Sequence, residues 1–405
     1  MGIEFSFNKN ILFIFIFPII FQFEQPVMKL YMKSDNDEKY FLFNIFKIFL
    51  SFLLSFVLVI IIKFRTYRMH KKIKSSDIEK KNLIYEQQTQ DLNPLSMILN
   101  KKKNQKFKQI ILFLIALSII GFVAYIVNYI PNTDKSFDMF PNSVRIFFEF
   151  ISFGLLSYFV LKQKYYAHHF VSIGIIFICL IILFIVNILQ FVKGEEEFNF
   201  WIFPYFVLYT LLYSSYNVLG KKYLDAYYRS PYSMLFIIGS INSLCLLLYD
   251  IIAYNVREEI SGVIIGFKDH ITSTSCFFAF LLELLIKFIY SIGIWLTIYY
   301  LSPWHFISSD VINEVFKFYV KIITLKIQNE KDDFYSKPVN IIVFTFVYVI
   351  NFLCSLIFNE VIIIKFHNLH LNTTKYIKLR EKKESSSLSE IKCSDEDSIA
   401  SVDSN

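Results

Sequence analysis

Apolar runs of about 18 residues or more recur along the chain, and they constrain its fold more than any other feature. A helix of that length can cross the hydrocarbon core of a bilayer, which is roughly 30 Å thick. Of the 405 residues, 55% are hydrophobic and 19% are aromatic, more than a water-soluble chain of this length could bury. The sequence therefore predicts an all-α, polytopic membrane protein.

We expect about ten transmembrane helices. The first candidate, 11–23, is short, but the small residues of a signal-peptide cleavage site do not follow it, which favours a membrane helix. A chain of nine helices with its N-terminus on the opposite side is the alternative. The other nine candidates are 41–63, 107–130, 144–162, 168–192, 200–219, 232–254, 275–300, 304–325 and 338–361.

The charge of the connecting loops predicts the orientation of these helices. The net charge is +7, and the basic residues crowd into short segments beside apolar runs, which argues against a nucleic-acid partner. If the N-terminus is cytoplasmic, the basic loops 65–106, 162–169 and 220–230 are cytoplasmic as well. Ten helices then place both termini in the cytoplasm. The alternate loops are acidic or balanced, and they are 131–143, 193–199, 255–274 and 326–338.

Three regions follow from this pattern. Residues 1–40 form an N-terminal segment with the short first helix, and residues 41–361 form the transmembrane domain. Residues 362–405 contain many Ser, Asp and Glu and few large apolar residues, so we expect a disordered cytoplasmic tail. Its serines are candidate kinase targets, and Tyr376–Leu379 fits a tyrosine-based sorting motif that an adaptor could bind.

Charged residues inside the apolar runs are the first candidate site residues, because each costs a few kcal/mol to insert into a bilayer. Several occur in pairs at positions i and i+4, which places both side chains on one helix face. Polar residues in neighbouring runs extend the candidate set. The charged pairs are Arg145 with Glu149, Glu283 with Lys287, and Asp310 with Glu314, and the polar residues are Tyr216, Asn217 and Asn242.

A purely structural interpretation of these charges stays open at this point. Arg145 lies near the mouth of its helix, where it could extend to the lipid headgroups. Glu283 and Lys287 could neutralise each other and hold two helices together. His168 and His169 are interpreted as residues at the membrane interface, and His305 as a structural residue at a helix start.

The sequence shows no catalytic or cofactor motif. A P-loop, a GxSxG elbow, an HExxH helix and a paired-cysteine metal site are all absent, and the five cysteines form no disulfide framework. We therefore expect no enzymatic activity, no catalytic residues, no cofactor and no metal.

Three segments resemble helices of the drug/metabolite transporter superfamily, in particular its nucleotide-sugar-transporter-like (EamA-type) members. Residues 143–183 are similar to the fourth and fifth helices, with an arginine opening a helix that ends in a Leu-Lys turn and a glycine in the next helix. Residues 217–239 resemble the region that joins the sixth and seventh helices. Residues 299–318 resemble the start of the ninth helix, where Asp310 matches an aspartate two turns in.

This resemblance implies two five-helix halves in inverted repeat, with a polar or anionic solute such as a nucleotide sugar bound near the midplane. Arg145 and Lys287 would then offer positive charge to the solute. The four carboxylates, Glu149, Glu283, Asp310 and Glu314, would balance that charge or carry coupling protons, and Tyr216 and Asn217 would contact a ring. The resemblance also implies an endomembrane location (Golgi, ER or endolysosomal), and we consider a homodimer.

Two departures from the family pattern weaken the assignment of a substrate. No glutamate follows Gly239, and the arginine that members carry one turn after the ninth-helix aspartate is replaced by Asn313 or Glu314. Two other functions therefore stay open. One is a membrane-embedded enzyme of lipid or glycan metabolism that uses His305. The other is a non-transporting scaffold or sorting protein that acts through its tail.

Overall fold

The computed structural model confirms an almost wholly helical membrane chain. Its described helices lie where the apolar runs predict them, and most ends differ by a few residues. The helices predicted to end at 63 and 219 continue to Lys72 and Tyr227, so most of the predicted loop 220–230 is helical. The structure describes residues 2–5, 41–72, 104–132, 142–163, 165–193, 202–227, 230–256, 263–264, 266–267, 274–328, 338–365, 373, 376–377 and 379–380.

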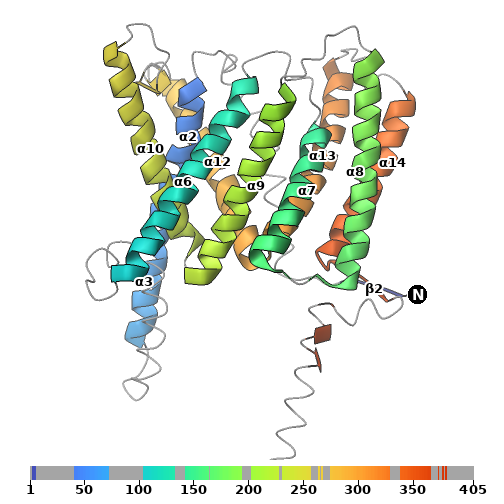
Figure 1. The fold of residues 1–405 in the computed structure, drawn as a ribbon, viewed down its shortest axis with the longest axis horizontal. Helices are drawn as coiled ribbons and strands as arrows, with labels where there is room; N and C mark the ends of the chain where they lie inside the picture. The colour runs from blue at the N-terminus through green and yellow to red at the C-terminus, as the bar shows by residue number, and fades with distance from the viewer. Residues whose placement is uncertain are drawn as a thin grey trace, which may run out of the picture.

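The helices follow one another as antiparallel rods (Figure 1). Two of them, α2 and α3, are consecutive parts of one rod that a single turn residue, Leu54, interrupts. Next to it the Ser51 and Ser55 hydroxyls donate hydrogen bonds to carbonyls of the preceding turn. The helices are α2 (Phe41–Leu53), α3 (Ser55–Lys72), α6 (Asn104–Asn132), α7 (Asn142–Leu161), α8 (Ala167–Lys193), α9 (Ile202–Tyr227), α10 (Pro231–Val256), α12 (Thr274–Tyr300), α13 (Pro303–Gln328) and α14 (Pro338–Phe358).

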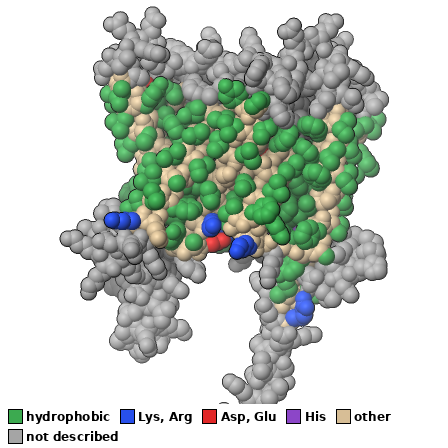
Figure 2. All heavy atoms as spheres, viewed as in Figure 1, with side chains coloured by type: hydrophobic (Ala, Val, Ile, Leu, Met, Phe, Trp, Pro, Cys, Tyr) green, Lys and Arg blue, Asp and Glu red, His purple; other side chains and the backbone are tan. Residues whose placement is uncertain are grey.

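The outer surface of the bundle is apolar. Leu112, Phe159 and Ile342 are each about two-thirds exposed, at 69%, 69% and 67%, and only lipid could cover so many outward-facing apolar groups. Figure 2 shows the resulting apolar band, with the Lys and Arg side chains of this face along its lower edge. Six of the described helical segments are long and apolar enough to cross a membrane. The chain is therefore a multi-pass integral membrane protein.

Helices far apart in the sequence pack side by side. The strongest pairings of this kind join α2 to α10, α8 to α14 and α7 to α13, and α9 lies between α6 and α7. In Figure 1 the helices α9, α7 and α13 occupy the middle of the row, with α10 at one end and α8 and α14 at the other. These three middle helices are not among the six most apolar spans, and they carry most of the candidate site residues.

Two short strands, which the all-α expectation did not include, join the ends of the described chain. Strand β1 (Gly2–Phe5) pairs antiparallel with β2 (Ile362–Lys365), with Gly2 opposite Lys365 and Phe5 opposite Ile362. Residues 362–365, which we had assigned to a disordered tail, are therefore part of a strand. The predicted helix 11–23 and most of the predicted tail lie outside the described residues.

The strand pair fixes which face holds the N-terminus. It lies beside the end of α14, at the lower face of the molecule in Figure 1, whereas α2 begins at the upper face. Residue 5 and residue 41 are thus on opposite faces of the bundle.

The contact between α2 and α10 depends on a glycine. A Cβ atom at Gly239 would lie 2.6 Å from Cβ of Phe52 and 2.8 Å from the backbone oxygen of Phe49. A real side chain would therefore force the two backbones apart. Gly174 in α8 provides the opposite case, because a Cβ atom there would meet nothing within 4 Å.

These two glycines give a matched test of the packing. Gly239→Ala should lower the free energy of unfolding by about 1–3 kcal/mol, the usual cost of overpacking. Gly174→Ala should be neutral or stabilise the protein by up to about 1 kcal/mol, since alanine favours a helix over glycine. Thermal unfolding of the purified variants in one detergent measures both effects, and equal melting temperatures would contradict the α2–α10 contact.

Candidate functional site

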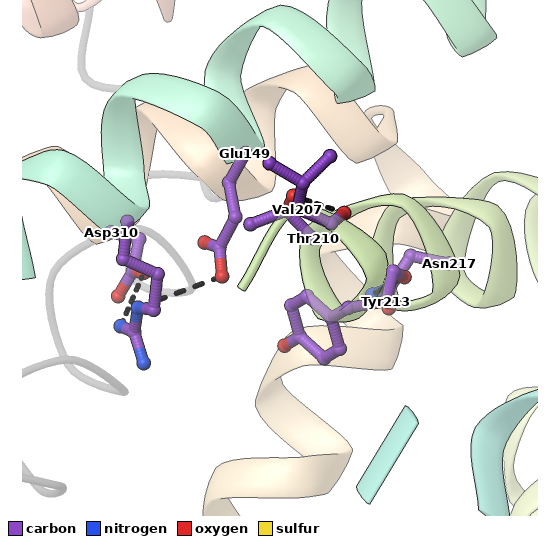
Figure 3. Close-up of polar contacts among 7 residues, drawn as sticks. Glu149, Val207, Thr210, Tyr213, Asn217 and Asp310 are labelled. Carbon is purple, nitrogen blue, oxygen red and sulfur yellow. Dashed lines mark hydrogen bonds and ion pairs between the residues drawn. The ribbon is translucent and has the colours of Figure 1, made fainter. Parts of the chain in front are cut away.

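The first group of buried charges joins α7 to α13. Arg145 Nε lies 3.6 Å from Glu149 Oε1 on its own helix, and Arg145 Nη2 lies 3.7 Å from Asp310 Oδ2 on α13. Dashed lines in Figure 3 mark both contacts and show the two carboxylates on either side of the guanidinium. The Glu149 side chain is 1% exposed, whereas Arg145 keeps 27% of its side-chain surface exposed. The sequence predicted the Arg145–Glu149 pair, and the structure adds Asp310 to it.

This arginine does not simply extend from a helix mouth to the lipid headgroups. Arg145 lies in the first turn of α7, and Asp310 lies two turns into α13. The two helices are antiparallel and begin at opposite faces of the bundle (Figure 1). Their contact therefore places both charges inside the bundle, where an ion needs a partner of opposite sign.

The second group joins α2 to α12. Glu283 accepts contacts from two lysines, with Lys47 Nζ 3.0 Å from Oε2 and Lys287 Nζ 3.1 Å from Oε1. Lys47 and Glu283 are almost fully buried, at 1% and 3% side-chain exposure, and Lys287 is 20% exposed. Glu283 and Lys287 were predicted to form a pair, but Lys47 was not recognised. Lys47 could have been recognised as a candidate from the sequence, because it is the only charged residue between 41 and 62 in an apolar run.

Two tyrosine side chains lie within electrostatic range of the charged groups. Tyr290 on α12 is within range of Arg145 and Asp310, and Tyr125 on α6 is within range of Lys287 and of Tyr290. No sequence pattern distinguishes these two tyrosines from the others among the 26 that the chain contains.

The two groups differ in the sign of their charge. Among the described side chains, the Arg145 group holds one cation and two carboxylates, and the Glu283 group holds two cations and one carboxylate. When all are ionised, the first group is net negative and the second is net positive. In each group the more exposed member is a cation, Arg145 or Lys287. The arrangement can therefore present positive charge to a solute while the buried carboxylates hold the cations in place.

The remaining predicted residues lie elsewhere. Asn217 Nδ2 donates to the Tyr213 carbonyl of its own helix at 2.8 Å, as Figure 3 also shows, and Asn242 Nδ2 donates to the Ser118 carbonyl on α6 at 3.3 Å. Tyr216 stands edge-on to the Trp295 ring, with centroids 5.3 Å apart. The Asn242 and Tyr216 contacts join helices, whereas the Asn217 hydrogen bond stays within α9, and none of these three contacts involves a charged side chain. The Glu314 side chain lies outside the described residues.

No protein-family model matches the sequence, and no curated protein is significantly similar to it. What the site does must therefore be argued from its geometry.

The Glu283 group predicts a coupled loss of stability. Lys47→Met should lower the free energy of unfolding by about 2–4 kcal/mol, because it removes one partner of a buried ion pair. The double variant Lys47→Met with Glu283→Gln should cost less than the sum of the two single changes by about 1 kcal/mol or more. Glu283→Gln alone leaves two neighbouring lysines without their shared carboxylate, and Lys47→Met removes one of these two charges.

Unfolding by sodium dodecyl sulfate in mixed micelles measures these differences. Lys63 is an exposed lysine on the same rod, and Lys63→Met should change stability by less than about 0.5 kcal/mol. Strict additivity of Lys47→Met and Glu283→Gln would show that the two residues do not interact.

Proposed function

We propose that the protein is a membrane carrier for a polar solute with an anionic group, for which a nucleotide sugar is one candidate, and that it is a divergent member of the drug/metabolite transporter superfamily. The observation that carries the proposal is the pair of partly exposed cations, Arg145 and Lys287, each held by buried carboxylates inside an apolar bundle. A membrane chain with no need to bind a polar group would gain stability from apolar residues at these positions.

Lys287 is the cation best placed to bind an anion. Glu283 has two cationic partners, so Lys47 can keep neutralising the carboxylate when Lys287 turns toward a solute. The buried carboxylate is therefore never left unpaired, which would cost several kcal/mol. Lys287 also has the exposed surface that such a movement requires, whereas Lys47 does not.

The Arg145 group is suited to a different role. Two carboxylates share one arginine, so the group carries an excess negative charge when both are ionised. Binding of one proton by the group would remove that excess negative charge. We assign the coupling proton of the carrier to this group.

The pairing of the helices supports two repeated halves. If each helix is exchanged with the fifth one after it, α2 replaces α10, α6 replaces α12, α7 replaces α13 and α8 replaces α14. Under this exchange the α2–α12 contact corresponds to an α10–α6 contact, and the α7–α8 contact corresponds to an α13–α14 contact. All four contacts are present in the structure. The pairs α2–α10, α7–α13 and α8–α14 are unchanged by the exchange, because their two members swap places. Halves of five helices would be inverted relative to each other.

In this arrangement both charged groups cross from one half to the other. Arg145 on α7 reaches Asp310 on α13, and Lys47 on α2 reaches Glu283 on α12. Alternating access needs contacts between the halves that can break and re-form. Ion pairs that a solute or a proton can weaken meet this need.

Ligand binding tests the solute site. The purified protein should melt at a higher temperature with one class in a panel of nucleotide sugars, nucleotides, amino acids and organic cations, because a ligand of the folded state stabilises it by mass action. The stabilisation should vanish in Lys287→Ala and persist in Lys222→Ala, which removes an exposed lysine at the end of α9.

The outcomes separate the candidate functions. A shift that persists in Lys287→Ala contradicts the assignment of this lysine. Well-folded protein with no shift for any anionic compound contradicts an anion carrier and favours a scaffold, whose function should then be lost on deletion of residues 380–405.

The position of the strands supports a membrane span between residues 5 and 41, and so ten spans with both termini in the cytoplasm. Short tags placed at the N-terminus and at the C-terminus should both be digested by a protease added to the cytoplasmic side of intact membranes. Asn372, in an Asn-Thr-Thr sequon, should carry no glycan. Tags on opposite sides of the membrane would support the nine-span alternative, whereas a glycan at Asn372 would contradict a cytoplasmic C-terminal segment.

A further inference from the structure

Three side chains with metal-binding atoms meet at the lower end of the α8–α14 pair. His168 and His169 lie at the start of α8, and Glu360 lies just after the end of α14. One ligand atom from each lies within 4.8 Å of the others. Both histidines are buried, and the Glu360 side chain is 17% exposed. None of the three belongs to the charged groups of the proposed solute site.

His168 lacks the partners that a buried imidazole normally has. Neither of its ring nitrogens makes a hydrogen bond within the described part of the chain, although the residue is only 5% exposed. Its Nε2 atom is 3.4 Å from Glu360 Oε1, longer than a well-formed hydrogen bond. Leaving such a polar group unpaired costs about 1–3 kcal/mol, so the ring is arranged for a ligand rather than for packing alone.

His169 supplies the second imidazole. Its Nδ1 atom accepts a hydrogen bond from the Tyr166 backbone N–H at 3.2 Å, which leaves the proton of the neutral ring on Nε2. A metal ion binds an unprotonated ring nitrogen, so His169 would coordinate through Nδ1, with the ion replacing the Tyr166 contact.

Glu360 occupies a position where glycine is usual. Its φ is 56°, and the bonds Val361 N–H to Leu356 O (2.9 Å) and Glu360 N–H to Ile357 O (3.1 Å) form a Schellman cap at the end of α14. A left-handed non-glycine residue costs about 1–2 kcal/mol. A glutamate at this position is explained if its carboxylate has a function there.

We propose that His168, His169 and Glu360 bind a divalent transition-metal ion, with Zn²⁺ as the best match. Two imidazoles and one carboxylate form a common zinc ligand set that leaves a fourth position for water. Ligand atoms on one tetrahedral zinc ion lie about 3.3 Å apart, given bonds of about 2.0 Å, so side-chain shifts of about an ångström bring the three into place. The ion would tie the start of α8 to the end of α14, next to the β1–β2 strands.

The test uses the full-length protein in detergent, treated with a chelator and then titrated with Zn²⁺ against a fluorescent zinc indicator. We expect one strong equivalent per chain and a melting temperature that rises by about 2–4 °C with excess zinc. Co²⁺ in place of zinc should give the intense visible absorption of four-coordinate cobalt.

Glu360→Gly is the decisive variant. It removes the carboxylate and also relieves the left-handed strain, so the protein should fold at least as well without zinc yet bind it at least tenfold more weakly. His168→Gln should weaken binding to the same extent. His305→Gln is the matched control, because His305 lies near His169, with ring centroids 6.0 Å apart, but its Nδ1 contacts Ser302 Oγ at 2.6 Å and it is not in the ligand set.

Two results would overturn the proposal. In the first, the unmodified protein binds no more zinc than the His168→Gln variant does, and the cluster is then an imidazole–carboxylate contact that binds no metal. If one equivalent binds with unchanged affinity in both variants, the ion lies at other residues. A failure of either kind leaves the solute-binding test unaffected, since that test depends on Lys287.

Discussion

The burial of charge inside a lipid-covered bundle is the constraint on which the rest of this structure depends. An unpaired ion in the bilayer core is expensive, so each buried carboxylate must bring a cation close to it. Glu149 has Arg145 on its own helix, and Glu283 has Lys287 on its own helix and Lys47 on α2. The cross-helix contacts, Arg145 to Asp310 and Lys47 to Glu283, fix how α7 faces α13 and how α2 faces α12. Apolar side chains alone would not specify these rotations, since lipid is as apolar as leucine.

The sequence predicted the contacts that lie along one helix and missed those that cross between helices. Spacing of four residues was enough to pair Arg145 with Glu149 and Glu283 with Lys287. Asp310 was recognised as a candidate, but its partner was not, because helix order along the chain does not say which helices touch. Lys47 was overlooked for the same reason: a lone charge in an apolar run shows its partner only when α2 and α12 are placed side by side.

The helices themselves were predictable because a membrane span needs about 20 apolar residues, a signal far longer than any turn. The strands β1 and β2 were not, since four-residue segments give too little periodicity and their pairing joins residues at opposite ends of the chain. The same distance in sequence concealed the cluster of His168, His169 and Glu360. Zinc motifs are recognised by short spacings, and this set has none. Glu360 is also hidden locally, because nothing in its neighbours indicates a left-handed backbone at that residue.

The two proposals place different demands on the contacts between the proposed halves. The charged groups lie on α2, α7, α12 and α13, where contacts must yield if a solute is to pass. The His168–His169–Glu360 cluster lies on the α8–α14 pair, at the end of the row of helices (Figure 1). A metal ion at that end would hold one edge of the two halves together while the ion pairs between α7 and α13 and between α2 and α12 exchange partners.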